Sequence, residues 1–225
     1  MYLKDIAMIA ADTSRTLFYL TKLLENDLLP NFVILFLNES DSLKPGQNNI
    51  DTKNELLDLL RKEKIMFHVA ENNDINSNEV ISLVKERKES FFIYSGFGGV
   101  LLRDGILDTG KNFLHVHGGY LPNYKGSTTN YYSLINDNAI GASSIFLTKD
   151  IDCGPVIMRK KFPPPTDRTL VDHIHDSAAR SNVLIETLKR YISNGKFEFE
   201  LEENKGGETF YIIHPVLKHI SILGE

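Results

Sequence analysis

The sequence predicts an α/β fold: a Rossmann-like, open and mostly parallel twisted sheet with a C-terminal hairpin and a long helix. Two observations predict this class. Short apolar runs alternate with amphipathic helical patterns through the first half of the chain, which is typical of parallel βαβ units with right-handed crossovers. Later in the chain, two apolar runs follow one another with no helix between them, which indicates a hairpin.

The first half contains seven expected elements in alternating order. In sequence order they are a strand at 6–11, a helix at 14–26, a strand at 31–38, a helix at 52–64, a strand at 65–71, a helix at 78–88 and a strand at 90–96. Between the second strand and its helix, residues 38–49 are rich in Ser, Asn, Gly and Pro. This composition favours a surface loop.

The second half begins with a strand that carries two histidines. The apolar pattern of residues 112–122 predicts this strand, and the glycine pair 118–119 within it marks the expected end of the strand. Residues 128–137 predict the next helix, because an amphipathic pattern follows a hydroxyl side chain suited to an N-cap, either Thr128 or Thr129. The carboxyl end of the strand therefore leads into the start of a helix.

A hairpin and the long helix complete the expected fold. Residues 139–148 and 154–162 predict two strands joined by a tight connection that contains acidic residues. An amphipathic pattern over residues 170–193 predicts a helix of about six turns. Residues 194–225 are expected to be irregular, with a short apolar end. We expect a catalytic core over residues 1–165, and a C-terminal helix with a short appendage of the same domain over residues 166–225.

Composition excludes several classes of protein. The chain has 225 residues, of which 42% are hydrophobic and 24% charged, values typical of globular proteins. The net charge of -5 disfavours a nucleic-acid partner. No apolar run approaches the roughly 20 residues of a membrane span, and the single cysteine, Cys153, fits a reducing compartment. We therefore expect a cytoplasmic protein that acts on a small molecule.

Three side chains with catalytic potential occur near strand ends. His115 and His117 are two residues apart, so on a strand both imidazoles lie on one face, and Asp152 follows in the expected hairpin connection. Ligands of open parallel sheets bind beyond the carboxyl ends of the strands. From the residues alone, a pair of core histidines and a metal site with three ligands both stay open.

Two stretches resemble a known family. Residues 115–127, HVHGGYLPNYKGS, followed by residues 141–157, GASSIFLTKDIDCGPVI, are similar to the formyltransferases that use N10-formyltetrahydrofolate. Members of that family have an Asn-x-His segment, then a Leu-Pro pair, an Arg-Gly or Lys-Gly pair, and an Asp-x-Gly motif. The resemblance covers roughly residues 90–160 in detail, and it agrees with the predicted fold.

The resemblance implies catalytic roles for the three side chains. His117 corresponds to the family's histidine and Asp152 to its aspartate, whereas His115 stands where the family has asparagine. Asn112 does not replace that asparagine, because an offset of five residues on a strand points to the opposite face. In the transfer of a formyl group to an amine, a base accepts a proton and a donor stabilises the oxyanion. We expect His115 to keep an oxyanion or substrate-positioning role.

The resemblance also implies a folate site and an acceptor. The pterin of N10-formyltetrahydrofolate is expected against Gly96, Phe97, Gly98, Gly99, Val100 and Leu101, with Asp150 and Ile151 beside the catalytic aspartate. Members that act on initiator tRNA carry an extra C-terminal domain, for which the residues after Asp152 leave no room. Purine-pathway members carry a glycine-rich phosphate loop, which residues 10–15 lack.

These differences favour the branch that formylates nucleotide-linked amino sugars for cell-surface glycans. Tyr120, Tyr124 and Lys125 are the expected substrate-binding residues, by stacking and by contact with a pyrophosphate. Tyr131 and Tyr132 belong to the same cluster, with packing of a helix onto the sheet as an equal alternative.

Other interpretations stay open. One is a metal-dependent hydrolase or deacylase that uses the histidine pair and Asp152. Another is a catalytically inactive module that binds a nucleotide sugar. A second pair, His173 and His175, falls in the expected long helix, where side chains two residues apart diverge, so no joint ligation is expected. Residues 208–220 are expected to form a docking strand, a lid or the contact of a homodimer, and the sequence does not choose among the three.

Overall fold

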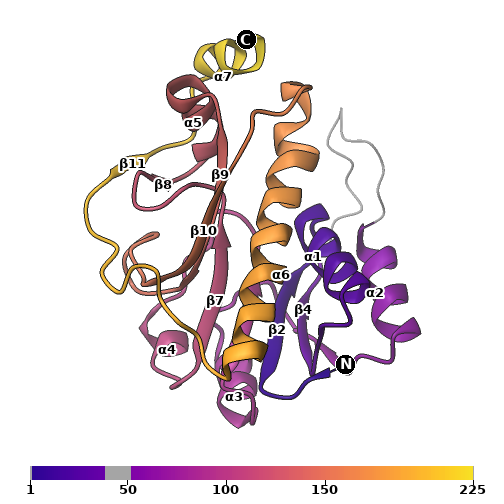
Figure 1. Cartoon of the computed structure of the whole chain (residues 1–225). Coiled ribbons are helices and arrows are strands. Elements are labelled where there is room, and N and C mark those ends of the chain that lie inside the picture. The colour runs from indigo at the N-terminus through magenta and orange to yellow at the C-terminus, as the bar shows by residue number, and fades with distance from the viewer. Residues whose placement is uncertain (1, 39–51, 225) are drawn as a thin grey trace. The chain divides into compact units, whose positions relative to one another are not determined.

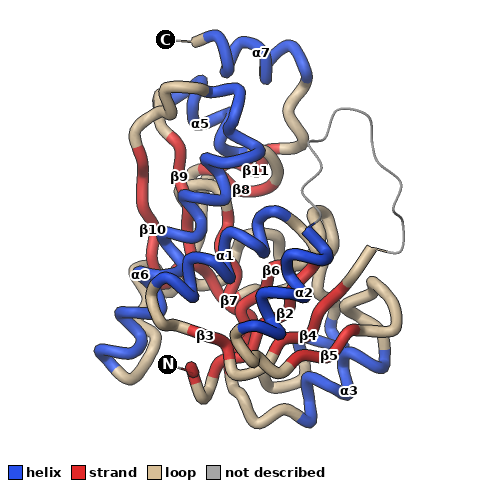
Figure 2. Tube along the Cα trace, turned by 90° about the vertical axis from the view of Figure 1, so that its right-hand side faces the viewer, coloured by secondary structure: helices blue, strands red, loops and turns tan. Residues whose placement is uncertain are grey.

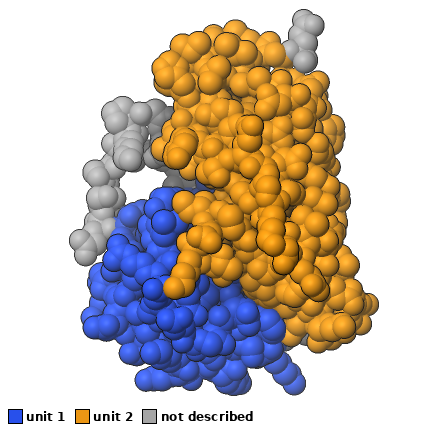
Figure 3. Space-filling view, turned by 90° about the vertical axis from the view of Figure 1, so that its left-hand side faces the viewer, with its two compact units in different colours: residues 1–113 blue, residues 114–225 orange. Residues whose placement is uncertain are grey.

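The computed structural model in Figure 1 describes residues 2–38 and 52–224. The chain divides into two compact units, residues 1–113 and 114–225, which Figure 3 colours separately. The expected surface loop at 38–49 lies, apart from Asn38, outside the described residues. The expected boundary at residue 165 between core and appendage stays a prediction. In the described part of the chain, no helix is both long enough and apolar enough to cross a membrane.

The first unit alternates strands and helices. Its elements are β1 (Tyr2–Leu3), β2 (Ile6–Ala11), α1 (Ser14–Glu25), β3 (Leu29–Pro30), β4 (Val33–Phe36), α2 (Thr52–Lys62), β5 (Phe67–Val69), α3 (Asn78–Glu86), β6 (Phe91–Ser95) and α4 (Asp104–Leu107). The strands β6, β2, β4 and β5 are hydrogen-bonded in that order, and all three pairings are parallel. Figure 2 shows these strands side by side.

Continuous burial explains why the apolar runs of this unit become strands. All six residues of β2 and all four of β4 are buried, as expected for central parallel strands covered on both faces. Helix α1 begins after Thr13, whose hydroxyl accepts a hydrogen bond from the Thr16 amide. Its buried residues include Tyr19 and Leu23, which are four apart and share one face.

The second unit contains the hairpin and the long helix. Strand β7 (Asn112–His117) leads into it, and its further elements are β8 (Tyr124–Gly126), α5 (Thr129–Asp137), β9 (Ile140–Phe146), β10 (Val156–Phe162), the 3₁₀ turn η1 (Arg168–Leu170), the π-helical segment η2 (Val171–His175), α6 (Asp176–Asn194), β11 (Glu208–Phe210) and α7 (Pro215–Leu223). Strand β9 pairs antiparallel with both β7 and β10. Helix α6 packs on β9 and β10 (Figure 1).

The fold class is confirmed. Seven main strands form an open, mostly parallel α/β arrangement, with four parallel strands in the first unit and three antiparallel strands in the second. The arrangement is open because β5 and β10 each have a neighbour on one side only among the described strands. The hairpin is also present, although its connection runs from Leu147 to Pro155 and is longer than the expected tight turn.

Three expected details were wrong. The helix predicted over 170–193 consists of η1, η2 and then α6, because Asp167 accepts a hydrogen bond from the Thr169 amide and starts the segment as a tight turn. The segment after Asn194 is not irregular throughout, since it contains β11 and α7. Thr128 precedes α5 without a side-chain capping bond, because its hydroxyl instead accepts a hydrogen bond from the Ile213 amide at 2.9 Å.

Candidate active site

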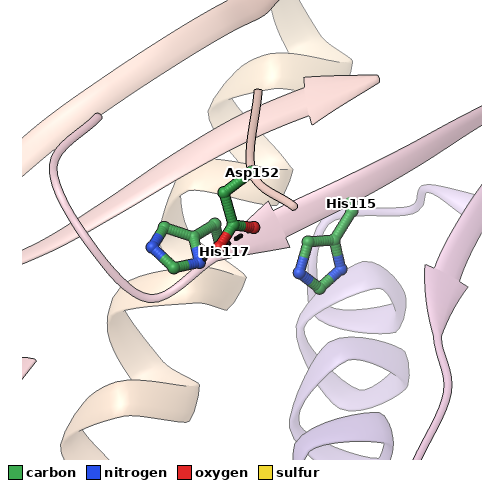
Figure 4. A group of neighbouring side chains, drawn as sticks. All are labelled: His115, His117 and Asp152. Carbon is green, nitrogen blue, oxygen red and sulfur yellow. Dashed lines mark ion pairs between the residues drawn. The ribbon is translucent and has the colours of Figure 1, made fainter. Parts of the chain in front are cut away.

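Strand β7 holds the two histidines on one face. Opposite them on β9 lie Ile145, which pairs with His115, and Ser143, which pairs with His117. The His117 side chain, at the end of the strand, belongs to a residue only 4% exposed, whereas His115 is half-buried. Figure 4 shows both rings on the same side of β7, together with the carboxyl group of Asp152. The predicted geometry of the pair is therefore observed.

A backbone contact fixes the tautomer of His117. Its Nε2 lies 2.7 Å from the carbonyl oxygen of Tyr124, and a carbonyl only accepts, so Nε2 carries the proton. A Cβ on Gly119 would lie 2.6 Å from this same carbonyl oxygen and 2.6 Å from Nε2. Glycine is thus required at position 119 for the close approach, and Nδ1 is left as the basic nitrogen of the neutral ring.

Asp152 faces that basic nitrogen. Its Oδ1 lies 3.3 Å from His117 Nδ1, and its Oδ2 accepts a hydrogen bond of 2.8 Å from the Gly126 amide. The aspartate is 8% exposed and has a φ of 52°, in the left-handed region that residues with a Cβ seldom adopt. The carboxylate is therefore held by the backbone amide and faces His117 Nδ1, to which it forms an ion pair when the imidazole is protonated.

The surroundings of His117 favour its neutral form. Burial lowers the pKa of the imidazole below its ordinary 6.5, the charge of Asp152 opposes this effect, and Arg180 adds to it. Arg180 donates to the carbonyl oxygen of Val116 at 2.9 Å and pairs with Asp176 at 2.7 Å. Because a neutral Nδ1 faces a carboxylate, the pair is able to take up one proton as a unit.

The same three side chains also form a possible ligand set for a metal. His115, His117 and Asp152 each offer one ligand atom, and these atoms all lie within 4.8 Å of one another. Two imidazoles and a carboxylate suit zinc and other divalent transition metals. The geometry therefore supports either proton transfer or metal binding.

The residues expected to hold folate lie in loops of differing exposure. Gly96 to Leu101 follow β6 in the first unit; Gly96 is buried, whereas Gly98 and Gly99 are exposed, and a Cβ on either of these two would meet no atom within 4 Å. In the same loop, Leu101 is 55% exposed. In the second unit, Asp150 is exposed and Ile151 is 50% exposed.

The residues expected to bind the acceptor differ in exposure. Tyr124 and Lys125 are each 5% exposed, and the Lys125 ammonium donates to the Asn204 carbonyl oxygen at 2.9 Å. Tyr120 is half-buried, and its ring is contacted by the cationic groups of Arg159 and Lys161 at 4.8 and 5.2 Å. Of the three residues, Tyr120 is therefore the most accessible in this structure.

Two further tyrosines and the second histidine pair also have clear positions. Tyr131 is 1% exposed and belongs to the core. The ring of Tyr132 packs against that of Phe210 at 4.5 Å between centroids. His173 and His175 lie in the π-helical segment rather than in a regular helix.

Two residues at the site have no signal in the motif. Arg180 donates to the backbone of β7, and Asn204 Nδ2 donates to the carbonyl oxygens of Asp152, at 2.6 Å, and of Gly154, at 3.2 Å. Asn204 is 52 positions from Asp152 in a segment without periodic pattern. Sequence reasoning found no signal there because such long-range contacts leave no local pattern.

The fold and the buried His117–Asp152 contact describe an α/β protein with a site able to move a proton, and comparison with known proteins names the family. A model of the formyl transferase family matches residues 4–188. The chain belongs to this family. It is 29% identical over 142 residues to a methionyl-tRNA formyltransferase of Finegoldia magna, a match that covers 60% of this chain and 45% of that protein. The chain spans less than half the length of the curated relatives it matches.

Solved structures share the fold. A sugar N-formyltransferase from Shewanella sp. FDAARGOS_354 matches with a TM-score of 0.64 and 13% identity, over 97% of this chain and 86% of that one. An N-formyltransferase from Helicobacter canadensis, in complex with folinic acid and dTDP-3-aminofucose, matches with a TM-score of 0.58 and 16% identity, over 93% and 71%. At these identities the likeness concerns the fold alone.

Proposed function

We propose that this protein transfers a formyl group from N10-formyltetrahydrofolate to the amino group of a nucleotide-linked amino sugar. The observation that carries the proposal is the buried contact of 3.3 Å between His117 and Asp152 in a chain that belongs to the formyl transferase family. Formyl transfer to an amine moves one proton from the attacking nitrogen to the leaving nitrogen. The pair has the chemistry that this proton transfer needs.

His117 and Asp152 act together as the base. The neutral ring, fixed by the contact of Nε2 with the Tyr124 carbonyl, accepts at Nδ1 the proton that the amine loses. The Asp152 carboxylate stabilises the resulting imidazolium at 3.3 Å. His117 then returns this proton to the leaving nitrogen, so the pair ends the cycle as it began.

His115 serves as the donor to the developing oxyanion. It takes the place of the family's asparagine and offers one ring N–H where the amide would offer two hydrogens. Its half-buried position beside His117 supports contact with a bound substrate. It lacks the amide's carbonyl, so it does not reproduce contacts in which that oxygen accepts.

N10-formyltetrahydrofolate supplies the activated formyl group when it is bound. Gly96, Phe97, Gly98, Gly99, Val100 and Leu101 hold the pterin, together with Asp150 and Ile151. In the first unit, the exposed backbone at Gly98 and Gly99 offers polar groups and the exposed side chain of Leu101 offers an apolar surface, and in the second unit the side chain of Ile151 is also exposed. The Helicobacter canadensis N-formyltransferase, which shares the fold, is in complex with folinic acid, and this supports a folate as the formyl donor by analogy.

The choice of acceptor rests on the comparisons and on the charge of the chain. The neighbours in fold include sugar N-formyltransferases, whereas the sequence relatives are methionyl-tRNA formyltransferases. The net charge of -5 favours the sugar, because tRNA binding draws on positive surface charge. Tyr120, Tyr124 and Lys125 remain the proposed acceptor-binding residues, with Tyr120 the most accessible of them. Cytoplasmic glycan biosynthesis and a homodimer follow as predictions of the same assignment.

A panel of acceptors tests this proposal. Purified protein is incubated with N10-formyltetrahydrofolate and either nucleotide-linked amino sugars or methionyl-tRNA, and tetrahydrofolate release is followed with the acceptor's mass gain. We expect release and formylation with an amino sugar and none with the tRNA. If only the tRNA is formylated, the proposed acceptor is wrong. If no amine is formylated, the proposed function is wrong.

The ligand set supports a second candidate, a metal-dependent hydrolase. His115, His117 and Asp152 would hold the ion, and the ion would activate a water for deacylation. Metal analysis of purified protein separates the two functions. A stoichiometric metal together with deacylase activity supports the hydrolase, whereas metal-free protein that transfers formyl groups excludes it. Binding of nucleotide sugar with neither activity would indicate an inactive module.

A further inference from the structure

A segment beyond the family match holds the loop of the catalytic aspartate. Residues 201–210, here called the strap, lie after residue 188, where the match to the family model ends. At one end of the strap, Leu201 exchanges backbone hydrogen bonds with Val156, at 2.8 and 3.1 Å. At the other end, β11 pairs in parallel with β8, which places Phe210 opposite Gly126. The strap is thus attached on both sides of the Asp152 loop.

Asn204 is the residue of the strap that contacts this loop. Its Nδ2 donates to the Asp152 carbonyl oxygen at 2.6 Å and to the Gly154 carbonyl oxygen at 3.2 Å. The residue is 5% exposed, so these hydrogen bonds are buried, and loss of the donor removes a buried partner from both carbonyl oxygens. The buried ammonium of Lys125 donates to the Asn204 backbone oxygen at 2.9 Å, which fixes the strap at this point.

Asp152 depends on such support. With a φ of 52°, its backbone is in the left-handed region that residues with a Cβ seldom adopt, and neighbouring contacts maintain this conformation. The carboxylate is aimed at His117 by the Gly126 amide. Gly126, whose amide binds the Asp152 carboxylate, pairs with Phe210 of the strap, and the Asp152 carbonyl accepts from Asn204. Both the side chain and the backbone of the aspartate are therefore held through the strap.

We propose that Asn204 is a positioning residue, which holds the Asp152 loop so that its carboxylate stays against His117 Nδ1. The catalytic meaning of this role rests on the proposed function, whereas the mechanical role does not. A displacement of about 1 Å at a catalytic group lowers a rate by up to about 100-fold. Loss of Asn204 therefore affects turnover more than it affects binding of the formyl donor.

The test compares Asn204→Ala and Asn204→Asp with a control. The aspartate has the same shape but no amide donor, and Lys205→Ala changes the neighbouring residue of the strap, whose side chain is 78% exposed. We expect both Asn204 variants to lower kcat about 10- to 100-fold with KM for the formyl donor unchanged. We expect the control to retain the wild-type kcat.

Hydrogen exchange of the Gly126 amide provides a readout that needs no activity. If Asn204 holds the loop, this amide exchanges faster in both variants under native conditions, while the core strand β9 keeps its protection. Unchanged kcat and unchanged exchange would overturn the proposal, as would faster exchange of Gly126 and β9 together. If the wild-type protein transfers no formyl group, the proposed function fails, and the exchange result still decides the role of Asn204.

Discussion

At the scale of single residues, position 115 is where this chain departs from the family motif. A histidine there places a second imidazole near the proton-transfer pair, with ligand atoms of the three side chains within 4.8 Å. An imidazole N–H is able to donate to an oxyanion as an amide does. On the proposed function, the departure changes which group stabilises the oxyanion and leaves the proposed acid–base pair of His117 and Asp152 intact.

Substitution of His115 tests this role. Removal of one donor from an oxyanion site commonly costs 10²- to 10³-fold in kcat. We expect His115→Ala to lower kcat by about 10²-fold. His115→Asn, which restores the family's donor, should lose less. The measurement is steady-state tetrahydrofolate release; a His115→Ala enzyme with wild-type turnover would contradict the assignment.

The stretches at residues 115–127 and 141–157 predicted His117 and Asp152 respectively, and the structure brings these two residues together. The contacts that hold them could not be predicted. The Nε2 bond to the Tyr124 carbonyl depends on a turn whose path needs a glycine at 119, and the support of Asp152 by Asn204 crosses 52 positions. A motif records which groups react, whereas their supports come from tertiary packing.

At the scale of elements, a buried carboxylate connects two turns of the first unit. Glu89, which is fully buried before β6, accepts hydrogen bonds from Arg87 at 2.8 and 2.9 Å and from the Asn31 side chain, which lies between β3 and β4. Burial alone would raise the pKa of Glu89, but these hydrogen bonds outweigh it and lower the pKa from 4.5 to about 2. The ionised form therefore stabilises the first unit.

This pKa predicts an acid-dependent loss of stability. Because the folded pKa of about 2 lies below the ordinary 4.5, the unfolded state binds the proton more readily between these values. The contribution of Glu89, on the order of 3 kcal/mol, is present above pH 4.5 and is lost as the pH falls towards 2.

Chemical denaturation at several pH values checks this prediction. The difference in the free energy of unfolding between wild type and Glu89→Gln should shrink as the pH falls through this range. The control is Glu86→Gln, which changes an exposed acid of α3. A difference that does not depend on pH would contradict the role of the ionised Glu89.

Strands and helices of the first unit were predicted more completely than those of the C-terminal third. The runs at β2 and β4 are apolar throughout because both faces are buried, so the pattern alone identifies them. Strand β11, with two of its three residues exposed, has no such pattern and forms only because β8 pairs with it. Within residues 208–220, the structure shows β11 paired with β8 and the start of α7, whereas a lid and the contact of a homodimer stay predictions.

At the scale of the whole molecule, the chain belongs to the formyl transferase family and has the fold of solved formyltransferases, whereas formyl transfer and its acceptor are proposals. The curated relatives are more than twice as long as the part this chain matches, so their tRNA specificity does not transfer with the shared core. On the proposed function, the His117–Asp152 pair transfers the proton that accompanies formyl transfer.

The most direct test is the rate of tetrahydrofolate release by His117→Asn in metal-free protein, with the exposed His173→Asn as control. Asparagine still donates a hydrogen bond, but it has no basic nitrogen, so the variant loses the general base alone. We expect a kcat about 10²- to 10⁴-fold below wild type at unchanged thermal stability, and a wild-type kcat in the control. A His117→Asn enzyme within a few-fold of wild type would contradict the account.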